Sequence, residues 1–147
     1  MSDYSPPRVL DASAIVELFH GHPMLMQLLD RAAAGQVAIG VPTAAIAEAQ
    51  AVLGVNAAMW DHILRLRGLV ELPLGAHGAL EVGRLARPRI INPVAYRPLT
   101  SPLQVAHVLH EARGLAGIVV TGIPEAYGGH PDITVHSLTP PPGPGAA

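Results

Sequence analysis

Two isolated acids stand where carboxylates that bind metals or catalyse reactions are often found. Asp11 directly follows the apolar pair Val9-Leu10 in "RVLDASAIVELF", and Glu48 is the only ionisable residue of "TAAIAEAQAVL". Moving a carboxylate out of water costs free energy unless a cation or a hydrogen-bond donor compensates. Two such acids suit an oxygen-liganded ion such as Mg²⁺. The alternative is that Asp11 caps a helix and Glu48 faces water, and the residues alone leave both interpretations open.

The histidines suggest a second kind of site. His107 and His110 are three residues apart in "HVLHE", which also contains Glu111. A zinc site needs three or four protein ligands, and the helical protease motif separates its two histidines by four residues. A partly exposed helical face or an interface is therefore favoured over a metal site for this pair. The chain also has no glycine-rich phosphate loop after a strand and no serine nucleophile elbow.

Composition narrows the class of protein. The chain has 147 residues, of which half are hydrophobic, and its formal net charge is −2. These values predict one globular domain and give no overall electrostatic footprint for nucleic acid. Cysteine is absent, which excludes disulfides and thiolate metal sites. No signal peptide and no apolar run of membrane-spanning length is found, so we expect a cytoplasmic protein without a membrane partner.

The elements that would position these acids alternate between strands and helices. Strands are predicted at 8–11, 37–42, 69–74, 117–121 and 132–138. Helices are predicted at 13–20, 23–34, 43–53, 57–67, 76–86 and 102–113, with a loop at 87–101 and a short helical turn near Glu125. This alternation predicts an α/β domain around a parallel sheet. Ligands bind beyond the carboxyl ends of such strands, where Asp11 and Thr121 lie.

The domain organisation follows from the same pattern. Residues 1–7 form an N-terminal lead-in, and residues 8–138 form the domain. The segment 139–147, "TPPPGPGAA", is rich in proline and glycine and is predicted to be a flexible tail.

Several segments together resemble a known family. In chain order, "VLDASAIVELF", "VPTAAIAEAQ", "IVVTGIPEAYGG" and "DITVHSL" resemble the PIN-domain family, and within it the small VapC-like toxins, over residues 8–138. The resemblance implies a three-layer α/β/α fold around a short, mainly parallel sheet. It also implies an endoribonuclease in which about four acids hold Mg²⁺ or Mn²⁺ to cleave RNA. It implies an antitoxin protein as a possible partner. Separately, the apolar helices at 13–34, with Met24 and Met26 expected to be exposed, favour a homodimer or an antitoxin-type groove.

The family's functional residues map only partly onto this sequence. Asp11 matches the first acid, and Ser13 matches the small hydroxyl residue that follows it. Glu48 matches the second acid, and Thr121 is retained near the end of the fourth strand. The resemblance thus assigns catalytic roles to these four residues and metal binding to Asp11 and Glu48.

The other two acids of the family pattern are missing. The third position falls at Val105, next to the uncharged Gln104, and the fourth falls at Ile123. Losing two carboxylates weakens the binding of a hard dication, because its affinity depends on ligand charge. We therefore expect weakened or lost nuclease activity, with a non-catalytic binding module or a structural oligomer as the alternative. The nearby groups that could rebuild the site are Glu125, Glu111 and His107.

Overall fold

The computed structural model describes residues 5–93, 95 and 97–138. The predicted lead-in is therefore described only from Ser5 to Pro7, and the predicted tail lies outside the described residues.

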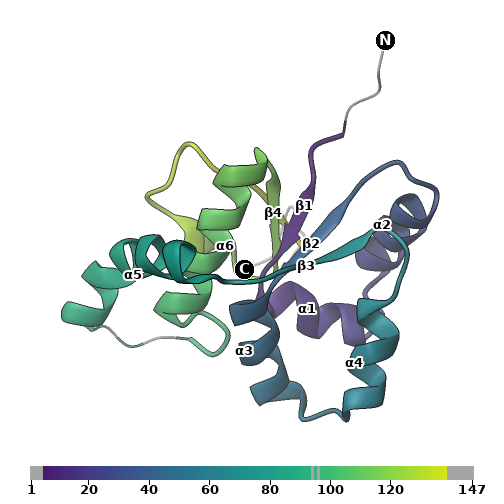
Figure 1. Cartoon of the computed structure of the whole chain (residues 1–147), viewed down its shortest axis with the longest axis horizontal. Coiled ribbons are helices and arrows are strands. Elements are labelled where there is room, and N and C mark those ends of the chain that lie inside the picture. The colour runs from purple at the N-terminus through teal and green to yellow at the C-terminus, as the bar shows by residue number, and fades with distance from the viewer. Residues whose placement is uncertain (1–4, 94, 96, 139–147) are drawn as a thin grey trace, which may run out of the picture.

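Five parallel strands form the central sheet, as the alternating pattern predicts. The strands are Arg8–Leu10 (β1), Ile39–Pro42 (β2), Leu69–Leu72 (β3), Ile118–Thr121 (β4) and Thr134–Ser137 (β5). Their order across the sheet is β3-β2-β1-β4-β5, and every pairing is parallel (Figure 1). All carboxyl ends therefore lie along one edge of the sheet. The central strand β1 brings Asp11 to the middle of that edge.

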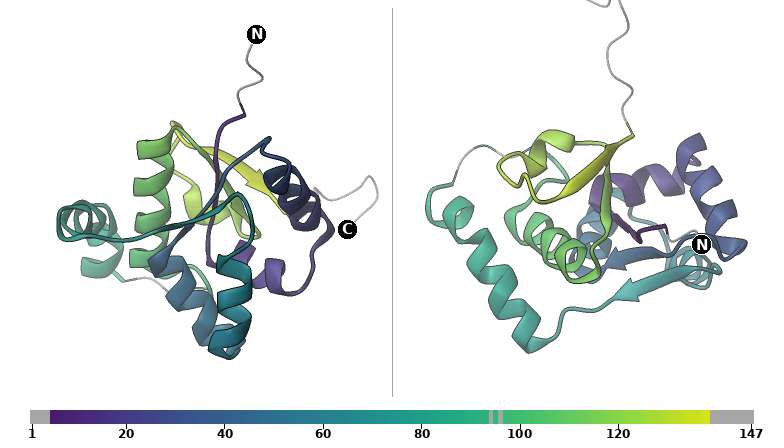
Figure 2. Two further views of the ribbon diagram at one scale, coloured as in Figure 1. Left: turned by 45° about the vertical axis from the view of Figure 1, so that its right-hand side comes forward. Right: turned by 90° about the horizontal axis from the view of Figure 1, so that it is seen from above.

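Helices pack against both faces of this sheet and complete the predicted three layers. They are Ala12–Phe19 (α1), Pro23–Ala33 (α2), Thr43–Leu53 (α3), Ala57–Leu64 (α4), Ala76–Ile91 (α5) and Pro102–Leu115 (α6), with a 3₁₀ helix at Pro124–Tyr127 (η1). Figures 1 and 2 show α5 and α6 on one side of the strands, with α1, α2 and α4 on the other. Within the described residues, no helix combines the length and the apolar character needed to cross a membrane.

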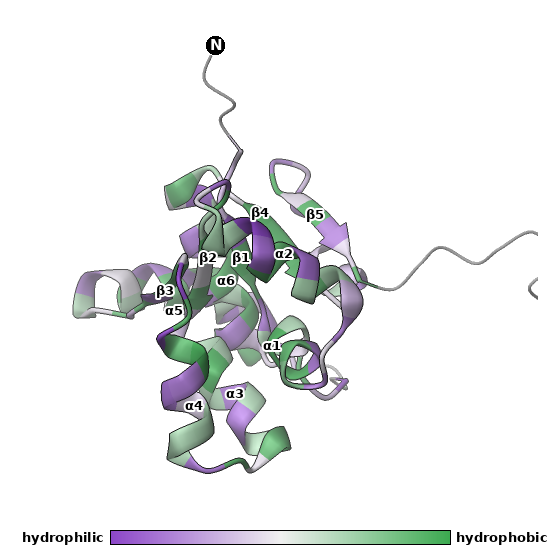
Figure 3. Ribbon diagram, turned by 90° about the vertical axis from the view of Figure 1, so that its right-hand side faces the viewer, coloured by the Kyte–Doolittle hydropathy of each residue, from purple (hydrophilic) through white to green (hydrophobic). Residues whose placement is uncertain are grey.

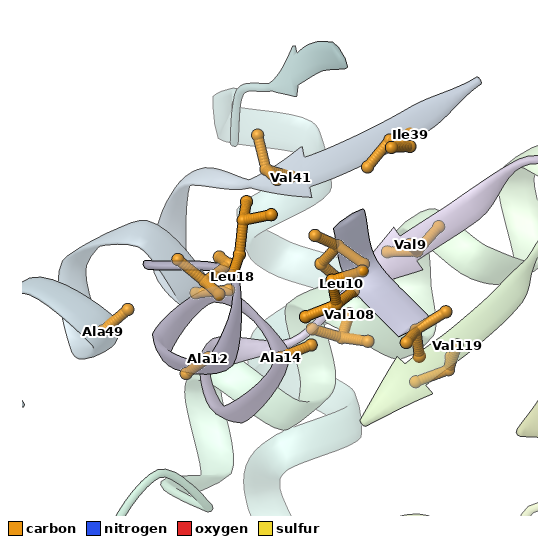
Figure 4. Packing of buried hydrophobic residues seen from close by; sticks show 14 of the residues in the cluster. Val9, Leu10, Ala12, Ala14, Leu18, Ile39, Val41, Ala49, Val108 and Val119 are labelled. Carbon is orange, nitrogen blue, oxygen red and sulfur yellow. The ribbon is translucent and has the colours of Figure 1, made fainter. Parts of the chain in front are cut away.

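The main hydrophobic core surrounds β1. Val9 and Leu10 are fully buried on opposite sides of this strand, as expected for the middle of a parallel sheet. Figure 4 shows Leu10 among core side chains of neighbouring elements, including Val108 from α6 and Leu18 from α1. The apolar run before Asp11 thus fixes β1 in the core and leaves the carboxylate at the end of the strand.

The structure corrects two predicted helix ends: α4 ends at Leu64 instead of residue 67, and α5 extends beyond residue 86. The sequence predicts a helix ending at residue 86 and a loop over 87–101, but α5 continues through Pro88 to Ile91. Proline lacks an N–H group, so it removes one intrahelical bond without preventing the following turn from forming. Asn92 closes that turn by donating its N–H to the Pro88 carbonyl at 3.1 Å.

Gly68 joins α4 to β3 in a backbone conformation that a side chain would disturb. Its φ is +85°, and a Cβ atom there would lie 2.6 Å from the Ala32 carbonyl oxygen. We expect Gly68→Ala to lower the free energy of unfolding by about 2 kcal/mol, because backbone strain and a steric clash add together.

Gly35 provides the matched control for this prediction. It also has a positive φ, of +76°, but a Cβ atom there meets nothing within 4 Å. Gly35→Ala should therefore cost only about 1 kcal/mol of backbone strain. Urea denaturation of both variants measures the difference, and equal losses would contradict the steric explanation.

Candidate functional site

Asp11 is held at the carboxyl edge of the sheet by three donors, two from the start of α1 and one from η1. It is the N-cap of α1, where its Oδ1 accepts hydrogen bonds from the Ala14 N–H at 2.9 Å and the Ser13 hydroxyl at 2.7 Å. Its Oδ2 accepts the Tyr127 hydroxyl at 2.8 Å. The residue is only 1% exposed. Asp11 is thus a helix cap, and both of its oxygens bind donors of the protein itself.

Ser13 and Thr121 meet beside Asp11. Their hydroxyl oxygens are 3.2 Å apart, although the residues come from α1 and from the end of β4. The Gly122 N–H donates to Ser13 Oγ, and the Ile123 N–H donates to Thr121 Oγ1, each at 2.9 Å. The two hydroxyls therefore join the start of α1 to the chain leaving β4.

Glu48 has a different local partner. This half-buried carboxylate accepts the Ser101 N–H at 3.2 Å and the Ser101 hydroxyl at 2.6 Å. Ser101 is the N-cap of α6, so Glu48 places negative charge at a helix N-terminus, where it is stabilising. The second assigned acid therefore anchors α6.

Gln104 occupies the position that faces the start of α1. Its Oε1 accepts the Ala12 N–H at 3.0 Å, and its Nε2 donates to the Leu99 carbonyl at 3.2 Å. Val105, at the position expected for the third acid, is buried in the main hydrophobic core. The residue of α6 that contacts the Asp11 region is thus a neutral amide.

The residues that could compensate for the missing acids have other partners. The expectation of a partly exposed helical face is wrong for His107, which is fully buried, whereas His110 is partly exposed. The Nδ1 atom of His107 accepts the Ala44 N–H at 3.3 Å, and its Nε2 lies 3.2 Å from Glu111 Oε1. Glu125 forms an exposed ion pair with Arg97. Across the described residues, no group of three or more histidine, aspartate or glutamate side chains is arranged to hold a metal ion.

Burial controls the electrostatics of the Asp11 cluster, which consists of Asp11 with Ser13, Gln104, Thr121 and Tyr127 around it. Desolvation raises the pKa of the Asp11 carboxyl above its usual value, and the hydrogen bonds that favour the charged form offset this only partly. The pKa of the Tyr127 phenol is raised well above 10.0, by burial first and then by the negative charge of Asp11. The phenol therefore stays protonated at neutral pH and serves as the donor.

The raised pKa of Asp11 predicts a pH dependence of stability. The folded state holds the Asp11 proton to a higher pH than the unfolded state does, so ionisation favours unfolding. We expect the stability of the native chain, relative to Asp11→Asn, to be greatest below about pH 4 and to fall as the pH rises through the folded-state pKa. Chemical denaturation of both proteins between pH 3 and 8 measures this difference. A difference that grows with pH would contradict the prediction.

The comparisons with known proteins bear on the fold. No family model and no curated protein matches the sequence. A chain in the crystal structure of VapBC2 from Rickettsia felis, bound to a DNA fragment from the promoter, is similar in structure with a TM-score of 0.62 and 16% identity, over 88% of this chain and 97% of that one. A chain of DNA-bound VapBC from Salmonella typhimurium gives a TM-score of 0.62 and 10% identity, covering 92% of this chain and 100% of that one.

A third similar structure belongs to a toxin–antitoxin complex from Klebsiella pneumoniae. It has a TM-score of 0.57 and 14% identity, over 90% of this chain and 98% of the other. These likenesses extend over almost the whole domain and establish the fold. The chain has a three-layer α/β/α fold like that of the chains in these toxin–antitoxin complexes, which is the fold that its sequence resemblance implies.

Sequence reasoning did not assign Tyr127 or Gln104 to this cluster. Tyr127 carried a weak signal, because a chain with only three tyrosines places one in "PEAYGG", just after the retained Thr121. Gln104 was noted only as the uncharged neighbour of Val105. A buried tyrosine usually needs a partner for its hydroxyl. That partner, Asp11, is 116 residues away in the sequence, so only the fold shows the pairing.

Proposed function

We propose that this chain is a VapC-like protein that does not use a catalytic metal and acts by binding a protein partner. The observation that supports this most strongly is the hydrogen bond from the Tyr127 hydroxyl to Asp11 Oδ2. Oδ1 already accepts two donors, and the Tyr127 hydroxyl leaves Oδ2 one free lone pair, so a cation would have to share Oδ2 with that hydroxyl or displace it.

The chemistry of the surrounding residues favours a site that holds no metal ion. A dication is bound tightly when several carboxylates share its charge. Gln104 is neutral, and its amide already forms hydrogen bonds with the Ala12 N–H and the Leu99 carbonyl. The side chain of Ile123 is apolar and lines a cavity next to Ser13. The hydrogen bonds of Asp11, Tyr127 and Gln104 stabilise the fold, and we infer that they leave no site for Mg²⁺ or Mn²⁺.

A cleavage assay tests the loss of nuclease chemistry. The full chain is incubated with a structured RNA and Mg²⁺ or Mn²⁺, beside Asp11→Asn as the matched variant. We expect no metal-dependent cleavage above the background of that variant. Cleavage that needs the metal and disappears in Asp11→Asn would show that the chain is an active ribonuclease.

A groove between α1 and α4 supports the second part of the proposal. A cavity of about 380 Å³ is lined by Leu18 and Phe19 from α1 and by Met59 and Ile63 from α4. Met59 is about half exposed. Apolar grooves between helices bind the apolar face of an amphipathic helix. The similar structures come from toxin–antitoxin complexes, so we propose an antitoxin-type protein as the occupant.

The sequence also suggests a partner surface on the segment 13–34. There, Met24 is exposed, but Met26 packs against the core. The homodimer suggested by the sequence stays a prediction.

Co-expression with the product of the adjacent reading frame tests the partner. We expect a complex that co-purifies with the native chain and is lost in Met59→Glu, because the new carboxylate would be buried in an apolar interface without a partner. Leu80→Glu on α5 is the matched control, since Leu80 is highly exposed and lies outside the groove. Equal binding by both variants would exclude this groove as the docking surface.

A further inference from the structure

A second cavity lies between α2 and the sheet, and it extends from Arg8 at the start of β1 to Val120 and Leu138 near the carboxyl edge. It has a volume of about 190 Å³ and opens between α2 and the strands β1, β4 and β5, which lie close together in Figure 3. Its polar lining includes Arg8, Arg31 and His136, and its apolar lining includes Leu25 and Leu28. None of the described residues that line this cavity is acidic.

The two arginines converge on one hydroxyl group. Arg8 Nη1 lies 3.3 Å from Ser5 Oγ, and Arg31 Nη2 lies 3.4 Å from the same oxygen. Arg8 also donates to the Pro6 carbonyl. Neither arginine forms an ion pair: no carboxylate of the described residues lies within 4.0 Å of either guanidinium group. Two positive charges therefore share neutral oxygen acceptors.

Among the described residues, no carboxylate offsets the repulsion between these two guanidinium groups. Arg8 is only 9% exposed, so water screens its charge poorly. Burial, and then the positive charge of Arg31, lower the pKa of Arg8 below its ordinary value. An anion in the cavity that displaced the Ser5 hydroxyl from the two guanidinium groups would turn this repulsion into attraction.

We propose that the cavity binds a phosphate monoester carried on a small apolar group. A phosphate monoester has a charge of about −1.5 to −2 at neutral pH, which matches two arginines, whereas a carboxylate balances only one. Guanidinium groups also present paired N–H donors that fit phosphate oxygens. The volume corresponds to about six water molecules, enough for the phosphate and a compact body against Leu25 and Leu28.

Calorimetric titration of the full chain tests this site, with phenyl phosphate as the probe. Inorganic phosphate and benzoate are the comparison ligands. We expect saturable one-to-one binding of phenyl phosphate, weaker binding of inorganic phosphate, and the weakest binding of benzoate. Arg31→Gln should weaken phenyl phosphate binding by about tenfold or more, because it removes a charge-assisted contact. Arg31→Lys should give an intermediate loss, since it keeps the charge but not the paired donors.

Arg87→Gln is the matched control, because Arg87 is exposed on α5 and the substitution changes the net charge equally. The Arg87→Gln substitution should leave the affinity for phenyl phosphate unchanged. Arg31 is also exposed, so its substitution should not unfold the chain. The proposal is overturned if phenyl phosphate shows no saturable binding, if both glutamine variants bind it like the native chain, or if benzoate binds as tightly. None of these outcomes depends on RNA cleavage or on a protein partner.

Discussion

Replacing Asp11 by alanine should lower the free energy of unfolding by about 3 kcal/mol. The substitution removes the N-cap of α1 and leaves the Ala14 N–H without its acceptor. It also leaves the buried Tyr127 hydroxyl unpaired and takes one acceptor from Ser13. Relief of the desolvated carboxylate offsets part of this loss, so the total stays below the sum of the separate contacts. Denaturation in urea at neutral pH measures the change.

Asp11→Asn is the control that separates hydrogen bonding from charge. The amide keeps one oxygen for the Ser13 and Ala14 donors, and its NH₂ group can donate to Tyr127, whose hydroxyl then accepts. We expect a loss of only about 1 kcal/mol. If the asparagine and alanine variants are equally destabilised, the ionised carboxylate rather than the hydrogen-bond network stabilises the site.

Gln104→Leu should also cost about 3 kcal/mol, because it leaves two polar groups without partners. The groups are the buried Ala12 N–H and the Leu99 carbonyl. Gln36→Leu is the matched control, since Gln36 is exposed, and it should change stability by no more than about 0.5 kcal/mol. Thermal and urea unfolding of the two leucine variants give the comparison. A small effect at Gln104 would show that water replaces its amide.

Gln104→Glu tests whether this position tolerates the carboxylate that the family pattern would place nearby. A protonated carboxyl can still accept from Ala12 and donate to Leu99, whereas an ionised one cannot donate. Burial next to a carbonyl raises the folded-state pKa, so stability should be close to native below about pH 4 and fall as the pH rises. Denaturation across pH 3–8 measures this, and constant stability would mean that the carboxylate finds a cation or water.

Much of the fold could be predicted from the sequence because its signals are local. The apolar pair before Asp11 and the β-branched run at 118–120 each indicate a buried strand, and the intervening helices indicate parallel pairing. The end of α5 was missed because proline predicts a helix boundary, although it removes only one bond.

The site was harder to predict because its contacts are long-range. The proximity of Ser13 and Thr121 followed from the topology, which brings the ends of β1 and β4 together. The pairing of Glu48 with Ser101, and of Asp11 with Tyr127, depends on the packing of elements that are distant in sequence. A carboxylate looks the same in the sequence whether it binds a metal, a hydroxyl group or a helix N-terminus. Its neighbours in space decide which of these roles it has.

Calorimetric titration of Mn²⁺ into the full chain, beside Asp11→Asn, tests the central claim most directly. We predict that the native chain shows no saturable binding that the variant lacks, because the donors of Tyr127, Ser13 and Ala14 engage both oxygens of Asp11. A site tighter than about 1 mM that is lost in Asp11→Asn would contradict this account and identify Asp11 as a metal ligand.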